Sequence, residues 1–150
     1  MHPVSTARAR GARGSVLMLM PVAVLIVLLL GAIAVDSAIV YLGQRQAHNV
    51  AFDAANDAAG AGLDLDAART SGEIVYDPDR VHAIAAQAVV TAGIDGLELV
   101  SAVPDGDGVV VTVRRTVEHL FVQALGDPAR DVLTISARVD GEVHRPDTAP

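Results

Sequence analysis

Apolar side chains fill one unbroken stretch near the start of the chain and recur at shorter periods after it. The stretch covers residues 16–35, VLMLMPVAVLIVLLLGAIAV, and contains no charged side chain. Twenty helical residues, at about 1.5 Å each, span roughly 30 Å, which is close to the hydrocarbon thickness of a bilayer. The pattern therefore predicts a transmembrane helix over 16–35. Pro21 cannot donate an N–H to the carbonyl of Leu17, so it marks the expected place of a kink.

The same stretch has one feature of a cleavable secretory signal. Ala32-Ile33-Ala34 has the small-x-small form that signal peptidase reads. Signal cores are usually about 7 to 15 residues long, whereas this stretch is longer, and residues 38–42 continue its apolar character. We favour the uncleaved anchor and keep cleavage near Ala34 as the alternative.

The residues after the stretch predict a continuation of the same helix. Between Asp36 and Ala59 there is no proline and a single glycine, and apolar or small residues recur at steps of three and four. This predicts a helical stalk over 36–62, loosened at Gly60 and Gly62. Its small residues form a seam that another helix could approach closely, either from the chain's own domain, which we favour, or from another molecule. We call the following residues the alanine seam: Ala47, Ala51, Ala54, Ala55, Ala58, Ala59 and Gly62.

Beyond the stalk, the pattern predicts a second helix and three strands. Asp77-Pro78-Asp79 provides a capping residue, a proline for the first helical position and an acid at the positive end of the dipole, and so predicts a helix over 78–92. Alternating residues predict strands over 97–103, 109–115 and 131–139, the first two joined by a hairpin turn at 104–108. Thr116 is the expected cap of a short helix after the second strand.

Together these elements predict an α+β fold in the order helix, helix, strand, strand, helix, strand. We expect a basic cytoplasmic N-terminus over 1–15, the transmembrane helix over 16–35, the stalk over 36–62, a small exported domain with a three-stranded sheet over 63–139, and a disordered tail over 140–150. About 115 residues outside the membrane suffice for one modest domain.

Charge is divided unequally around the apolar stretch. Arg8, Arg10 and Arg13 precede it, whereas all eighteen acids follow it, beginning with Asp36. The positive-inside rule then places the N-terminus in the cytoplasm, with Arg13 and Asp36 at the two membrane boundaries. From Asp36 onward there are eight arginines against eighteen acids, a formal balance of −10. Such a surface is a poor match for nucleic acid. We expect the Asp36 carboxylate to be solvated; pairing with a cation on a neighbouring subunit is the alternative.

Composition restricts the ways in which the domain can be stabilised. The chain has no cysteine, which excludes disulfides and thiolate metal sites, and only 3% of its residues are aromatic. Alanine, valine and leucine must therefore form the core.

Residues that could carry chemistry are scattered along the sequence. The five histidines have no metal-binding spacing, and the serines are not in a nucleophile-elbow motif. Asp105-Gly106-Asp107-Gly108 resembles the start of a calcium loop, but Thr116 stands where such a loop needs its last acid, so we interpret it as a hairpin turn. We expect a protein that is not an enzyme and that holds no cofactor and no metal.

Both ends of the predicted fold carry residue patterns of one known family. At the N-terminal end these are Arg13-Gly14-Ser15, Ala34-Val35-Asp36, Tyr41, Arg45, Asn49, Asp53, Ala54, Ala55, Asp57, Ala58, Ala59 and Gly62. At the C-terminal end they are residues 109–113 (VVVTV), Phe121, Leu125-Gly126 and residues 133–137 (LTISA). In these positions, over most of residues 13–139, the chain resembles TadE/TadG-like proteins of the Tad (tight adherence, Flp) pilus system.

The resemblance implies a single-pass, pilin-like protein anchored in the bacterial cytoplasmic (inner) membrane, with its C-terminal domain outside the cytoplasm. Its expected partners are the lipid bilayer and other pilin-like or Tad-apparatus proteins, in homo- or hetero-oligomers. TadE-like pseudopilins carry a Glu five residues after the processing glycine; counted from Gly14, that position is Leu19. The chain is therefore more similar to an unprocessed TadG-like or otherwise divergent member. The alternative from a different class is a soluble binding domain, secreted or anchored, with release by cleavage near Ala34.

Overall fold

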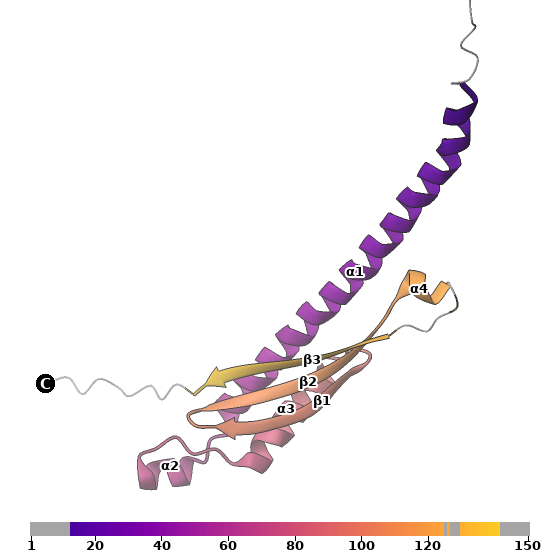
Figure 1. Cartoon of the computed structure of the whole chain (residues 1–150). Helices are drawn as coiled ribbons and strands as arrows, with labels where there is room; N and C mark the ends of the chain where they lie inside the picture. Colours follow the sequence, from indigo (N-terminus) through magenta and orange to yellow (C-terminus); the bar gives the residue numbers. More distant parts are fainter. Residues whose placement is uncertain (1–12, 125, 127–129, 142–150) are drawn as a thin grey trace, which may run out of the picture.

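The computed structural model describes residues 13–124, 126 and 130–141, and one long helix dominates it (Figure 1). Helix α1, Arg13–Ala61, has 49 residues and runs without a break through the predicted anchor and stalk. Pro21 lies inside α1 and does not end it. By length and composition, α1 is a candidate membrane span. Most side chains from Leu19 to Val35 are exposed, so none of the other described elements covers this half of α1.

Three antiparallel strands form the sheet, in the order β1-β2-β3. They are β1 (Leu97–Asp105), β2 (Gly108–Glu118) and β3 (Arg130–Asp140). Side chains alternate between the two faces of a strand, and Val109, Val111 and Val113 are fully buried on the inner face, as the alternation predicts. The outer face carries polar groups such as Thr112 and Ser136, whose hydroxyl groups lie 2.8 Å apart.

Two helices cover the inner face of the sheet. The second half of α1 contacts β2 and β3, while α3 (Pro78–Thr91) contacts β1 and lies beside α1. Asp77 caps α3 by accepting the backbone N–H groups of Asp79 and Arg80 at 3.0 and 3.3 Å. The core between the layers is built from the alanines of α1, the valines of β2, and Val81, Ala85 and Val89 of α3. The fold is therefore α+β, with a long apolar N-terminal helix, further helices and an antiparallel three-stranded sheet.

A further short helix, α2 (Leu65–Ser71), precedes α3 and was not predicted. Asp64 caps it, and Gly72, at φ 73°, ends it in the left-handed conformation that glycine adopts readily. No residue of α2 is buried. Because it presents no apolar face to the core, it leaves no helical period in the sequence.

The short helix expected after the second strand is present, but its predicted start at a Thr116 cap is wrong. β2 continues through Thr116 to Glu118, and only α4 (Leu120–Ala124) is helical. Thr116 pairs with Val132 of β3 and donates its N–H to the carbonyl of Gly96 at 2.9 Å. Val117 is buried against α1. The contact is close, because a Cβ atom added to Gly43 of α1 would lie 2.8 Å from Val117 Cγ2. Pairing with β3 and packing on α1 thus favour strand over local helix propensity.

Strand β3 ends close to the hairpin that joins β1 and β2. Asp140, predicted to begin the disordered tail, is the last residue of β3, and Gly141 donates its N–H to the carbonyl of Asp107 at 2.8 Å. The remainder of that tail, 142–150, lies outside the described residues, as does 1–12 of the predicted cytoplasmic N-terminus.

Gly62 and Gly60 provide a matched test of how closely α1 packs. A Cβ on Gly62 would collide with the carbonyl oxygen of Ala58 and lie 2.6 Å from Val81 Cγ2, whereas a Cβ on Gly60 would meet nothing within 4 Å. Neither glycine has positive φ, so backbone strain does not distinguish them. We predict that Gly62→Ala lowers the free energy of unfolding by about 1–3 kcal/mol, since overpacking forces neighbours apart.

Gly60→Ala should instead leave stability unchanged or raise it by up to about 1 kcal/mol, because alanine favours helix over glycine. Chemical denaturation of the full chain in detergent, followed by circular dichroism, measures both. Equal effects of the two substitutions would contradict close packing at Gly62.

Candidate functional site

The alanine seam faces the chain's own sheet and α3. Its six alanines are at most 4% exposed, and Gly62 is buried as well. Of the two uses that the sequence allows, the structure shows packing within the domain. The seam is consequently covered in this chain and is not a free surface for a second molecule.

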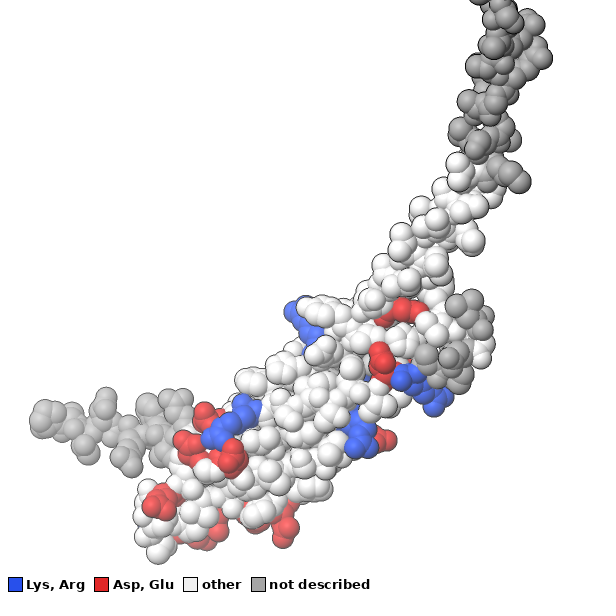
Figure 2. All heavy atoms as spheres, viewed as in Figure 1, with Lys and Arg blue, Asp and Glu red and all other residues white. Residues whose placement is uncertain are grey.

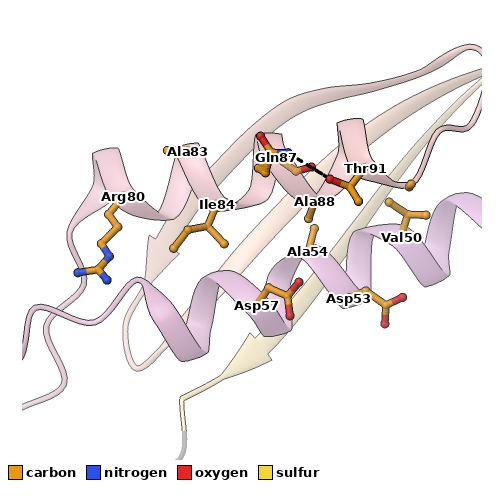
Figure 3. Close-up of a pocket in the computed structure, with 11 residues that line it drawn as sticks. Val50, Asp53, Ala54, Asp57, Arg80, Ala83, Ile84, Gln87, Ala88 and Thr91 are labelled. Atoms are coloured by element: carbon orange, nitrogen blue, oxygen red, sulfur yellow. Dashed lines mark hydrogen bonds between the residues drawn. The ribbon is translucent and has the colours of Figure 1, made fainter.

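An open groove lies between α1 and α3, above the buried seam (Figure 3). Its volume is about 620 Å³. In Figure 3, Ala54 of α1 and Ala88 of α3 point toward one another across its floor, with Ile84 beside them. Asp53 and Asp57 lie along the α1 side, and Gln87 donates to Thr91 at 3.2 Å on the α3 side. The lining is mainly apolar, and its polar residues are Asp53, Asp57, Arg80, Gln87 and Thr91.

Asp36 occupies the opposite end of the domain, at the limit of the apolar stretch. It is 5% exposed and accepts three backbone N–H groups from the first turn of α4. Oδ1 accepts hydrogen bonds from the N–H groups of Leu120 and Phe121 at 3.0 and 3.2 Å, and Oδ2 accepts one from the N–H group of Val122 at 3.3 Å. Asp36 therefore supplies the cap of α4 from a distant part of the chain. The expectation of a solvated carboxylate is wrong, because the first turn of α4 covers it.

The surroundings of Asp36 favour its charged form. Burial alone would raise the pKa of this carboxyl group, but the three backbone donors and the nearby His119 outweigh burial and hold the pKa below its ordinary value of 3.8. His119 is itself paired through Nε2 with Asp131 Oδ2 at 3.2 Å. The capped helix and the His119–Asp131 contact together close the end of the domain that faces the apolar half of α1.

Arg115 makes a second polar contact between sheet and helix. On the inner face of β2, its guanidinium group donates to the carbonyl of Gly43 at 3.2 Å and to Gln46 Oε1 at 2.7 Å. The alternation of the sequence is enough to place Arg115 among the inward-facing positions of β2, but it does not identify the groups that Arg115 contacts. With Asp36, it fixes α4 and the end of β2 to the same segment of α1.

One arginine bridges the carboxylates at the hairpin between β1 and β2. Arg138 of β3 binds Asp105, Asp107 at 3.0 Å and Asp140 at 2.8 Å. These ion pairs show that the carboxylates serve a hairpin turn, as the sequence predicts for residues 104–108. Within the described residues, no group of three or more His, Asp or Glu side chains is placed to hold a metal ion.

The remaining residues singled out in the sequence lie apart from one another. Arg13 is the first residue of α1, and Pro21 lies in its apolar half. His48 and His82 are exposed on α1 and α3, while His2 and His144 lie outside the described residues.

Comparison of the chain with protein-family models, with curated proteins and with solved structures finds no match. The interpretation of function therefore depends on the sequence patterns and on the geometry described above.

One signal in the sequence could have identified the buried Asp36. Residues 36, 40, 43, 47, 51, 54 and 58 follow one another at steps of three and four, so Asp36 is in phase with the alanine seam. A carboxylate in phase with a buried face must find partners, since an unpaired buried charge is costly. Only the identity of those partners required the structure.

We predict a pH-dependent effect of Asp36→Asn. Because the folded-state pKa lies below the ordinary 3.8, the stabilisation by Asp36 is complete above about pH 4 and is lost as pH falls through the folded-state pKa. The variant should thus melt at a lower temperature than wild type at pH 7, and the difference should shrink below pH 4.

Melting temperatures of both proteins in detergent, measured from pH 7 to pH 3, check this. Asp53→Asn, on an exposed acid of the same helix, is the control and should show no such difference. A gap between wild type and Asp36→Asn that stays constant with pH would refute the capping role.

Proposed function

We propose that this chain is a non-enzymatic, membrane-anchored, pilin-like component of a Tad/Flp-type pilus assembly or secretion apparatus. One observation carries the proposal: a single helix is bare and apolar from Leu19 to Val35 and forms the core of its own domain from Ala47 to Ala59. The chain thus has one rigid element that serves both as anchor and as scaffold. A tethered enzyme needs only a flexible link to its anchor, whereas an assembly subunit benefits from a fixed one.

The distribution of charge supports a single-pass arrangement. Figure 2 shows an uncharged surface on the described part of the bare helix, with acidic and basic side chains confined to the domain. With the arginines before the stretch and all acids after it, the positive-inside rule places the N-terminus in the cytoplasm and the domain outside the bacterial cytoplasmic membrane.

Leu19 favours a role in assembly over a place in the fibre. A processed prepilin would offer an acid at this position for neighbouring subunits, and this chain offers a leucine. The chain would then stay in the membrane unprocessed. Its partners would be other pilin-like or Tad-apparatus proteins, in homo- or hetero-oligomers.

The alternative is an exported binding domain that is released by cleavage near Ala34. The buried residues of the described chain begin at Asp36, so cleavage after Ala34 would leave the core and the cap of α4 intact. Such a product could fold without the anchor.

Fractionation of cells that express the chain with a C-terminal tag separates these two arrangements. We expect the uncleaved chain in the membrane fraction, resistant to carbonate extraction, with the tag digested by protease added to spheroplasts. A shortened product in the soluble exported fraction would support the alternative and refute the anchor. A protected tag would refute the orientation.

The role in assembly requires a genetic test in a bacterium that makes Flp-type fibres and encodes this chain. We expect deletion to abolish surface fibres in electron micrographs, at least tenfold by count, and the full chain to restore them. Residues 35–150, exported behind an unrelated cleavable signal, serve as the control and should fail to restore fibres. Unchanged fibres on deletion, or full rescue by the released domain, would overturn the proposal.

A further inference from the structure

Helix α4 is one of several parts of the domain that expose large apolar side chains, and it is the one that lies next to the apolar stretch of α1. Leu120 is 61% exposed and Phe121 is 45% exposed, and Val132, near the start of β3, is also exposed. The chain has two phenylalanines, and the other one, Phe52 on α1, is 49% exposed. Phe52 and Phe121 thus have similar exposure but lie at different distances from the apolar stretch.

The hydrogen bonds to Asp36 fix the position of α4 along α1. Asp36 is the first residue after the apolar stretch, and its carboxylate holds the first turn of α4 directly. A hollow of about 390 Å³ is lined by Ile33 of the apolar stretch together with His119 and Val122. Side chains at α4 and a residue within the predicted span therefore border the same space. Figure 1 shows α4 at the end of the domain nearest the bare half of α1.

We propose that α4 lies in the outer interface of the bilayer and inserts Leu120 and Phe121 among the lipid chains. The inference rests on the proposed anchoring, since the apolar stretch sets the height of the membrane. Twenty residues of α1 fill the hydrocarbon layer at about 1.5 Å each, so Asp36 and the turn that it caps meet the boundary. Apolar side chains on a short helix at that depth gain free energy by leaving water.

The backbone N–H groups at the start of α4 are arranged to tolerate the interface. Backbone N–H groups without partners are costly near hydrocarbon, but those of Leu120, Phe121 and Val122 are bonded to Asp36. Nε2 of His119 is paired with Asp131, whereas its buried Nδ1 has no hydrogen-bond partner among the described residues. The cap that buries Asp36 thus also prepares α4 for contact with lipid.

Tyr41 supports the same boundary from another side of α1. It is 65% exposed and lies five residues beyond Asp36, about 8 Å along the helix axis. Tyrosine side chains are enriched at this level of a membrane, where the ring meets apolar groups and the hydroxyl meets water. Two contacts with the interface, at Tyr41 and at α4, would hold the domain against the bilayer on more than one side.

The experiment uses the absence of tryptophan from the chain, which makes any introduced tryptophan the sole reporter. Three full-length variants, Phe121→Trp, Phe52→Trp and Leu28→Trp, are reconstituted in phosphatidylcholine vesicles, with and without bromine on the acyl chains. Leu28 lies in the apolar stretch, and Phe52 is about 24 Å beyond Asp36 along α1. Circular dichroism confirms that each variant is folded.

We expect brominated lipid to quench Leu28→Trp and Phe121→Trp at least twofold and Phe52→Trp hardly at all. Quenching of Leu28→Trp without quenching of Phe121→Trp would overturn the lipid contact and leave the anchor in place. A blue-shifted but unquenched Phe121→Trp would indicate that a protein, such as a second copy, covers α4, and would also overturn it. Loss of quenching at Leu28→Trp would refute the anchor and the inference together.

Discussion

Close packing of α1 on the sheet is the constraint on which the rest of this structure depends. Alanine has so little side chain that the helix can approach the valines of β2 directly, and the resulting core has few large side chains to absorb a change of volume. Gly43 shows the same close approach to β2, because a Cβ there would lie 2.8 Å from Val117 Cγ2. Gly62, just after α1, shows it toward α3, because a Cβ there would lie 2.6 Å from Val81 Cγ2. The N-terminal half of α1 does not pack on the sheet, and its exposed apolar side chains from Leu19 to Val35 require an apolar environment outside the domain.

Features that depend on neighbours in sequence could be predicted. The capping residue Asp77, the alternation of Val109, Val111 and Val113, and the unbroken helical period after Asp36 are local patterns, and the structure contains each of them. The predicted helix start at Thr116 was wrong because Thr116 pairs with Val132 of β3 and so continues β2. Local helix propensity does not take account of a pairing with a strand that comes later in the chain. Helix α2 was not predicted because none of its residues is buried, so its sequence shows no apolar helical face.

The site residues divide in the same way. The seam was visible as a row of small residues, but whether it faced its own domain or another molecule depended on where the sheet lay. The buried state of Asp36 follows from its phase with that row, yet its partners are 84 to 86 residues away in the chain. Arg115 shows the same limit: its inward position is periodic, whereas its bonds to Gly43 and Gln46 are tertiary.

The continuity of α1 also has a mechanical consequence. Because α1 is continuous between the apolar half and the domain, a change in its tilt in the proposed membrane arrangement would be passed to the domain as a rigid rotation. Between Asp36 and Ala61 the helix extends about 38 Å, so a change of roughly 10° in tilt would displace its far end by about 7 Å. A difference in bilayer thickness would therefore register as a lateral movement of the α2 end of the domain.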